Sequence, residues 1–464
     1  MKLYKSLLFV LAAIALLAVV CIFFPQPGVT IGSVELHFPS IDDMFRGDTV
    51  AARTADQMLL DIEKTMQVEV VQELDSAQQA RLDSLAFYQN FFASNPSRIV
   101  CPDDDPTFFA PIFQALDSAR KHFVHVIHYG DSQIEGDRIS GYLRARLQEK
   151  FGGSGPGLLP VVQPIGATSV AQTLSDSLSA YYAGGMMGKR ATHSRYGAMA
   201  QFAQLHDDSV SITVQSRRVK GFGRLTLYAG HIDNQLNINV GGRTATMSGG
   251  DGMQHLTFNL GQLRNKINID LAGSAEVYGI AIDGGNGVSL SNIPMRGSDG
   301  TFFTRIDRST MSYMLNHLNT RLIIMEFGGN ALPYLTDSVK VARFCKGFGK
   351  QLDHMRAVCP DARILVIGPA DMSVKVDGEL QSHRMLPQVV SALSETSTTH
   401  GAAYWDMYSV MGGHNSMIAW VDHQPSWAAP DYIHFTRRGA DRIASVLWQT
   451  LMIYYDYLKF MAAE

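Results

Sequence analysis

The sequence predicts an α/β fold: a three-layer α/β/α domain on a parallel sheet, interrupted by an antiparallel β-sandwich and preceded by an N-terminal transmembrane helix. Three observations support this. Apolar strands alternate with helical stretches in the second half, short alternating stretches fill the middle, and an uncharged apolar run opens the chain. We divide the chain into a membrane anchor or signal (1–24), an extended linker and helical stalk (25–119), the first part of the α/β domain (120–166), the inserted β-sandwich (167–275) and the second part of the α/β domain (276–464).

The composition excludes one large class of partner. With 464 residues the chain can bury at least one full core. Its formal charge of −4 and isoelectric point near 6.4 lack the basic excess that is typical of nucleic-acid-binding proteins. We therefore expect no nucleic-acid partner.

The N-terminus predicts a membrane anchor. Lys2 and Lys5 precede residues 6–24, an apolar run of about the length that spans a bilayer. The lysines favour a cytoplasmic N-terminus, which places the rest of the chain outside the cytoplasm, in the periplasm if the source is a bacterium. No small-x-small cleavage site closes the run before Pro25, so the pattern favours an uncleaved single-pass anchor over a cleaved signal.

Residues 54–92 carry an apolar stripe at helical spacing that includes Met58, Ile62 and Leu85. Such a helix could be a stalk or could pack on the following domain, and both remain open. Three cysteines lie beyond the apolar run, and a disulfide between Cys345 and Cys359 stays open as well. No cysteine or histidine spacing is typical of zinc.

The stretch His125-Val-Ile-His-Tyr-Gly-Asp-Ser-Gln133 reads as a brief buried strand ending in a turn. We expect Ser132 at the carboxyl end of that strand, facing the amides that open a helix over 134–151, where negative charge is stabilised. By itself the turn is weak evidence, because ordinary turn chemistry with an N-cap serine also explains it. His125 and His128, three apart on one strand, point to opposite faces and are expected to be core or site-wall residues.

Two further stretches bring complementary chemistry. Asp431 and His434 are three residues apart, just before a final amphipathic run over 440–460 for which Thr436 is a natural N-cap. One loop could therefore hold the carboxylate against the imidazole and point the other ring nitrogen at a serine. The hydrophobic strand over 322–327 ends in Gly328-Gly-Asn330, which places an amide side chain at a strand's carboxyl end.

These stretches, in this order, resemble the blocks of the SGNH (GDSL-type) hydrolase family. Gly130-Asp-Ser-Gln133 is similar to the first block, Gly328-Gly-Asn330 to the third and Asp431-Tyr-Ile-His434 to the fifth. The second block fits Asn292-Ile-Pro-Met-Arg-Gly297 if Pro294 replaces a glycine. Gln133 after the serine and Ala331 after the asparagine depart from the usual pattern.

The resemblance implies a fold and a site. It implies the SGNH-type fold of bacterial peptidoglycan or polysaccharide O-acetylesterases, whose catalytic domain is interrupted by a β-domain. It also implies a catalytic triad of Ser132, His434 and Asp431, with an oxyanion hole from Ser132, Gly297 and Asn330, and no cofactor or metal.

Three functions follow as hypotheses. The first is an exported esterase that removes O-acetyl or other short acyl groups from cell-wall or surface polysaccharide. The second is a membrane-anchored polysaccharide O-acetyltransferase that uses the same triad and works with a membrane-bound acyltransferase partner. The third is a non-catalytic polysaccharide-binding protein on a degenerate scaffold.

The middle of the chain carries two weaker signals. The inserted β-domain has few aromatic residues with which to bind sugar: Phe222, Tyr228, Phe258 and Tyr278. Each could equally be core, and sugar binding by the insert is a hypothesis. The glycine-rich stretch 152–157 follows a helix and lacks the lysine of a phosphate-binding loop, so we expect no nucleotide site.

Overall fold

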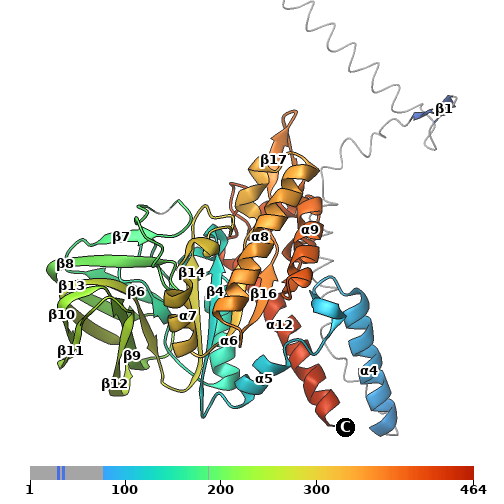
Figure 1. The fold of residues 1–464 in the computed structure, drawn as a ribbon. Coiled ribbons are helices and arrows are strands. Elements are labelled where there is room, and N and C mark those ends of the chain that lie inside the picture. The colour runs from blue at the N-terminus through green and yellow to red at the C-terminus, as the bar shows by residue number, and fades with distance from the viewer. Residues whose placement is uncertain (1–28, 32–33, 37–76, 187, 464) are drawn as a thin grey trace, which may run out of the picture. The chain divides into compact units, whose positions relative to one another are not determined.

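The computed structural model describes residues 29–31, 34–36, 77–186 and 188–463. The chain divides into two compact units, residues 1–54 and 55–464. In the first unit, β1 (Val29–Ile31) pairs antiparallel with β2 (Val34–Leu36). The second unit contains all the other described elements and every predicted site residue (Figure 1).

A six-stranded sheet forms the centre of the second unit, in the order β14-β4-β15-β16-β19-β3. The strands are β14 (Gly287–Pro294), β4 (Phe123–Gly130), β15 (Thr320–Glu326), β16 (Arg363–Ile367), β19 (Ala403–Trp405) and β3 (Ile99–Val100). The first five are parallel, and β3 joins the edge antiparallel. The carboxyl ends of five neighbouring strands therefore meet along one edge, where α/β folds place their ligands.

Helices cover both faces of this sheet because its strands are apolar on both sides. Val126 faces α5 (Ala110–Asp117), α6 (Ser140–Phe151) and α12 (Arg437–Ala462). Ile127, one residue on, faces the core shared with α7 (Arg308–His317), α8 (Ser338–Val358) and α9 (Leu386–Thr399). The arrangement is helix, sheet, helix (Figure 1).

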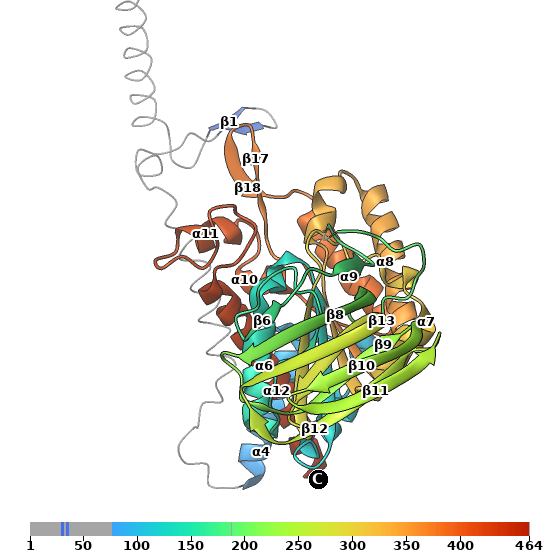
Figure 2. The same cartoon turned by 90° about the vertical axis from the view of Figure 1, so that its left-hand side faces the viewer.

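The inserted domain is one sheet, not the two separate sheets of the predicted sandwich. Hydrogen bonds join nine antiparallel strands around the long β8 (Gln201–Ser216) and β13 (Lys266–Asp283) (Figure 2). The other seven are β5 (Gly157–Leu159), β6 (Val170–Leu174), β7 (Ser179–Tyr182), β9 (Phe222–Gly230), β10 (Ile232–Val240), β11 (Arg243–Gly250) and β12 (Gln254–Arg264). β13 runs without a break through residues 275 and 276, where the sequence placed the domain boundary.

Shorter elements complete the described chain. They are α4 (Ala77–Ser94), α10 (Met407–Met411), α11 (Ser416–Asp422), the hairpin β17 (Ser373–Val376) and β18 (Glu379–Ser382), and four 3₁₀ helices: η1 (Pro102–Asp104), η2 (Ser132–Asp137), η3 (Phe303–Arg305) and η4 (Gly329–Tyr334).

The described part of the predicted stalk helix, α4, packs on the domain. Tyr88 and Tyr457 rings lie 5.2 Å apart, and the Phe92 ring lies 4.8 Å from that of Tyr454 on α12. Aromatic contacts of this kind bury large apolar surfaces. This part of the helix is therefore anchored to the C-terminal helix.

The predicted fold class was wrong in including a transmembrane helix. In the described ranges, no helix is long and apolar enough to cross a membrane. The longest, α12, is amphipathic: Arg437 and Arg438 are exposed, whereas Ile443 and Leu447 are buried. Residues 6–24, on which the prediction rested, lie outside the described residues.

The three described cysteines, Cys101, Cys345 and Cys359, are free thiols and buried. The disulfide considered between Cys345 and Cys359 does not form. Burial raises the pKa of each of these thiols, to about 11 at Cys359, which fits small apolar core residues better than reactive ones.

Candidate active site

Ser132, His434 and Asp431 form a continuous hydrogen-bonded chain. Ser132 Oγ lies 2.7 Å from His434 Nε2, although the two residues are 302 positions apart in the sequence. His434 Nδ1 lies 2.7 Å from Asp431 Oδ2. This is the arrangement in which a histidine can take a proton from a serine while a carboxylate fixes its tautomer.

A single turn holds Asp431 against His434. Asp431 Oδ1 accepts hydrogen bonds from the amides of Ile433 and His434, both at 3.0 Å, while Oδ2 faces the imidazole. Partial burial raises the pKa of Asp431, but these hydrogen bonds outweigh it and hold the pKa below its usual value. The carboxylate is therefore charged at neutral pH.

Thr436 caps the helix that follows this turn, as the sequence predicts. Its side chain accepts a hydrogen bond from the amide of Gly439 and donates to the carbonyl of Trp427. The histidine turn is thus fixed to the start of α12.

Ser132 lies directly beyond β4, as expected, but not at the start of a long helix. It opens the short η2, and α6 begins only at Ser140. Gly136, Asp137 and Ile139 all have positive φ, which interrupts a continuous helix. Asp131 caps η2 instead: its Oδ1 accepts from the amide of Gln133 at 2.9 Å.

The second and third sequence blocks lie on either side of the first because β14 and β15 flank β4. Gly297 and Asn330 line the same pocket as Ser132. Among the described contacts, the amides of Ser132 and Gly297 donate to no other group. Asn330 Nδ2 donates to Asp131 Oδ2 at 2.8 Å and to the carbonyl of Ser298 at 3.1 Å, so an oxyanion would have to replace one of these acceptors.

Buried carboxylates lie beneath the serine. Burial raises the pKa of Asp131 to about 7, and the nearby Glu326 and Glu135 act in the same direction against hydrogen bonds from Gln133 and Asn330. His128 Nε2 lies 3.2 Å from Glu326 Oε2, without the geometry of a hydrogen bond.

Sequence reasoning missed two residues that join the serine turn to the histidine turn. The amide of Gln133 donates from Nε2 to the carbonyl of Ile433 at 2.6 Å and accepts at Oε1 from the amide of Phe435 at 3.2 Å. The guanidinium of Arg138 donates to the carbonyls of both Ser132 and Phe435. The only signal in the sequence was the departure from the family pattern at Gln133.

The pocket around the serine and histidine has a volume of about 240 Å³ and is partly open to solvent. It runs along the carboxyl ends of β4, β15 and β16 to Met407 beyond β19. Phe327, Pro369, Ala370 and Met372 give its inner part an apolar lining. Such a pocket can take a short acyl group together with part of a larger alcohol.

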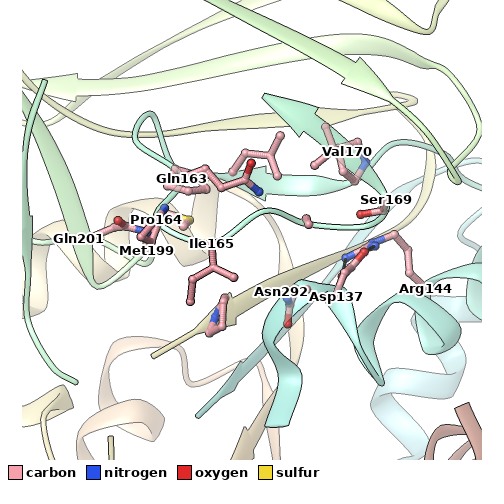
Figure 3. Close-up of a pocket in the computed structure, with 16 residues that line it drawn as sticks. Asp137, Arg144, Gln163, Pro164, Ile165, Ser169, Val170, Met199, Gln201 and Asn292 are labelled. Carbon is pink, nitrogen blue, oxygen red and sulfur yellow. Dashed lines mark hydrogen bonds and ion pairs between the residues drawn. The ribbon is translucent and has the colours of Figure 1, made fainter. Parts of the chain in front are cut away.

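A second pocket lies between the insert and the serine turn (Figure 3). Asp137 and Arg144 lie at its wall and bind each other through both carboxylate oxygens. Asn292 is held by Ser140 and by the carbonyl of Ile134. These polar groups are satisfied within the protein, and no member of the triad lines this pocket.

The other predicted candidates are structural. His125 is buried between Thr320 and Ser291, whose hydroxyls lie 2.8 and 2.7 Å from its ring nitrogens. His128 is buried too, next to Ser140. Within the ranges that the structure describes, no group of three or more His, Cys, Asp or Glu residues could hold a metal ion. The four insert aromatics considered for sugar binding are all buried: Phe222, Tyr228, Phe258 and Tyr278.

Comparison with solved structures identifies the same fold in a peptidoglycan O-acetylesterase. The TM-score is 0.63 at 20% sequence identity, with 76% of this chain and 97% of the other covered. The predicted resemblance to this kind of esterase with its inserted β-domain is thus confirmed for the fold. No protein-family model matches the sequence, and no curated protein matches it significantly.

A weaker similarity is found to a family two carbohydrate esterase from Cellvibrio japonicus. Its TM-score is 0.26 at 10% identity, with 62% of this chain and 99% of the other covered. At that level of similarity it supports no conclusion about this chain.

Proposed function

We propose that this protein is a serine esterase that removes O-acetyl or other short acyl groups from polysaccharide. The observation that carries the proposal is the chain of two 2.7 Å contacts from Ser132 through His434 to Asp431. It opens into a pocket at the carboxyl ends of the parallel strands. No residue of this chain need change its position for the first proton transfer to take place.

In the proposed mechanism, His434 Nε2 takes the proton from Ser132 Oγ as the oxygen attacks the acyl carbonyl. The new C–O bond converts the carbonyl into a tetrahedral oxyanion. Asp431 stabilises the imidazolium and keeps Nδ1 protonated. The charge that develops on His434 is therefore matched by a carboxylate already in place.

We assign the oxyanion to the amides of Ser132 and Gly297 and to Asn330 Nδ2. The two amides have hydrogens to donate, and Asn330 would exchange the carbonyl of Ser298 for the oxyanion. Loss of one such donor typically lowers kcat by roughly 10²–10³-fold.

The tetrahedral intermediate then collapses. The bond to the sugar oxygen breaks, and His434 returns its proton to that oxygen, which leaves an acyl-serine. Water attacks the acyl-serine while His434 accepts its proton. The bond between the acyl carbon and Ser132 Oγ then breaks, His434 returns the proton to Oγ, and the carboxylic acid is released.

The polysaccharide substrate is supported by the fold shared with a peptidoglycan O-acetylesterase. Peptidoglycan lies outside the cytoplasm, which supports a site of action there. Because the two sequences are only 20% identical, the acyl group and the sugar are part of the proposal.

The test uses the full-length protein with p-nitrophenyl acetate and with O-acetylated polysaccharide. We expect nitrophenol and acetate release that Ser132→Ala abolishes without lowering the thermal midpoint. Ser426→Ala, at a serine that lines no part of this pocket, is the control. Equal rates for wild type and Ser132→Ala would refute the proposal.

A sugar acceptor added to the same reaction separates hydrolysis from transfer. Free acetate alone is the result expected of an esterase. If mass spectrometry instead finds the acceptor acetylated, the enzyme is an acetyltransferase that uses the same triad.

A further inference from the structure

The mouth of the pocket is unusually apolar. Eight large hydrophobic side chains are exposed in the described part of the chain, and three of them line this one pocket. They are Met186, 79% exposed, Tyr334, 71% exposed, and Ile433, 36% exposed. Exposed apolar side chains scattered singly need no explanation, but a group at one site indicates a ligand.

These three side chains, the apolar rim, come from three distant parts of the chain. Tyr334 ends η4 after the third sequence block, and Ile433 precedes His434. Met186 belongs to the inserted domain, in the segment that follows β7. The insert therefore supplies part of the mouth of the pocket.

Backbone contacts hold Met186 in place. Its amide donates to the carbonyl of Arg296 at 2.8 Å. Its side chain lies over Gly297, so close that a Cβ added to Gly297 would be 2.8 Å from it. Arg190 donates to three carbonyls of the same segment, those of Tyr182, Gly184 and Gly185. The exposed methionine is thus on a braced segment, next to the proposed oxyanion-binding glycine.

Charge limits what the apolar rim can bind. The exposed residues of the pocket lining are the three of the rim together with Pro333, and none of them is charged. The lining includes the carboxyl side chains of Asp131, Glu326 and Asp371 and no lysine or arginine. A negatively charged sugar substituent at the rim would therefore meet no lysine or arginine and would be repelled by ionised carboxylates of the lining.

We infer that the apolar rim holds the uncharged sugar ring that carries the ester, an inference that rests on the proposed function. The C–H face of a pyranose ring can pack on Tyr334 and Met186 while its hydroxyls stay in water. The ester oxygen then points inward to Ser132. The acyl group occupies the inner part of the pocket, where Phe327, Ala370 and Met372 are buried and apolar.

The experiment compares Met186→Ala, Tyr334→Ala and Tyr334→Phe on O-acetylated chitotetraose, p-nitrophenyl acetate and p-nitrophenyl octanoate. Val339→Ala is the matched control, since Val339 is 68% exposed but lies on α8 and lines no part of the pocket. For Tyr334→Ala we expect kcat/KM on the chitotetraose ester to fall about tenfold more than on p-nitrophenyl acetate, mainly through KM. Tyr334→Phe keeps the ring, so it should retain most of the wild-type kcat/KM on the chitotetraose ester.

Two results would overturn the inference. Equal losses on all three substrates, or none, would mean that the apolar rim does not contact the sugar. A loss confined to p-nitrophenyl octanoate would assign the rim to the acyl chain.

Failure of the proposed function is recognised separately. It would appear as activity that does not depend on Ser132. In that case binding of chitotetraose, measured by calorimetry with Ser132→Ala and Ser132→Ala/Tyr334→Ala, still tests the apolar rim, and equal affinities would refute it.

Discussion

The side chain of Gln133 forms hydrogen bonds with the backbone on both sides of His434. It donates to the carbonyl of Ile433 at 2.6 Å and accepts from the amide of Phe435 at 3.2 Å. The residue next to the proposed nucleophile therefore positions the proposed base. Arg138 adds a second link, from the carbonyl of Ser132 to that of Phe435.

We predict that Gln133→Leu lowers kcat with little change in KM. Two hydrogen bonds, each worth about 1 kcal/mol, are lost, which corresponds to a fall of roughly 10–30-fold if both act on the placement of His434. Gln133→Glu keeps an acceptor for the amide of Phe435, so its kcat should lie between those of wild type and Gln133→Leu. Steady-state kinetics on p-nitrophenyl acetate measure this, with the exposed Gln388→Leu as control. An unchanged kcat in Gln133→Leu would show that the histidine turn holds itself in place.

Asp131→Asn should lower kcat about tenfold or more. In wild type Asn330 Nδ2 donates to Asp131 Oδ2, whereas the NH₂ group of the new asparagine can face Asn330 Nδ2, so two donors would oppose each other. Gln133 keeps its acceptor, so η2 should remain capped. Kinetics and circular dichroism together measure this. A wild-type kcat in Asp131→Asn would mean that the hydrogen bond between Asp131 and Asn330 has no role in turnover.

The raised pKa of Asp131, about 7 against 3.8 when unfolded, also has a consequence for stability. The folded state binds the proton more tightly, so this contribution to the free energy of unfolding is complete below pH 3.8 and is lost as the pH rises through about 7. Urea unfolding at pH 5 and pH 8 should show a smaller difference in Asp131→Asn than in wild type. Identical differences in the two proteins would contradict the prediction.

His317 should act in the opposite direction. Partial burial, with the neighbouring His255 and Arg224, lowers its pKa from 6.5 to about 4, and its Nδ1 lies 2.7 Å from the hydroxyl of Tyr228. Its contribution to stability is therefore present above pH 6.5 and is lost as the pH falls through about 4. His317→Gln keeps an acceptor but cannot be protonated. Thermal midpoints at pH 7.5 and 4.5 should differ less in this variant, and a difference as large as in wild type would count against the assignment.

Gly153→Ala should destabilise the fold by about 3 kcal/mol or more. Its φ is +112°, and a Cβ there would overlap the backbone of Val288 at the start of β14. Gly347→Ala is the matched control, because Gly347 lies inside α8 with nothing within 4 Å of a Cβ and should gain up to about 1 kcal/mol. Urea unfolding measures both. Similar effects of the two changes would show that the contact with Val288 can relax.

Much of the local structure follows from the sequence. Thr436 caps α12, as expected. The predicted approach of Asp431 to His434 is present, because the carboxylate also binds amides only two and three residues away. Interactions of this range depend on residue types at short spacings, which a sequence displays directly.

Other expectations failed where distant packing decides. The helix expected directly after Ser132 starts later because of three positive φ values, and the predicted sandwich is one hydrogen-bonded sheet. β14, which carries Asn292, was not recognised as a strand, because Ser289, Ser291 and Asn292 interrupt its apolar residues.

By itself, therefore, the sequence determined the separate pieces: the strand before Ser132, the Asp431–His434 turn and the glycine–asparagine turn at Asn330. The tertiary structure decided how they meet. The strand order β14-β4-β15 places these turns along one edge, and the insert carries Met186 to the mouth of the same pocket. Strand order and the approach of an inserted loop depend on contacts between residues more than a hundred positions apart, and residue spacing along a chain does not encode such contacts.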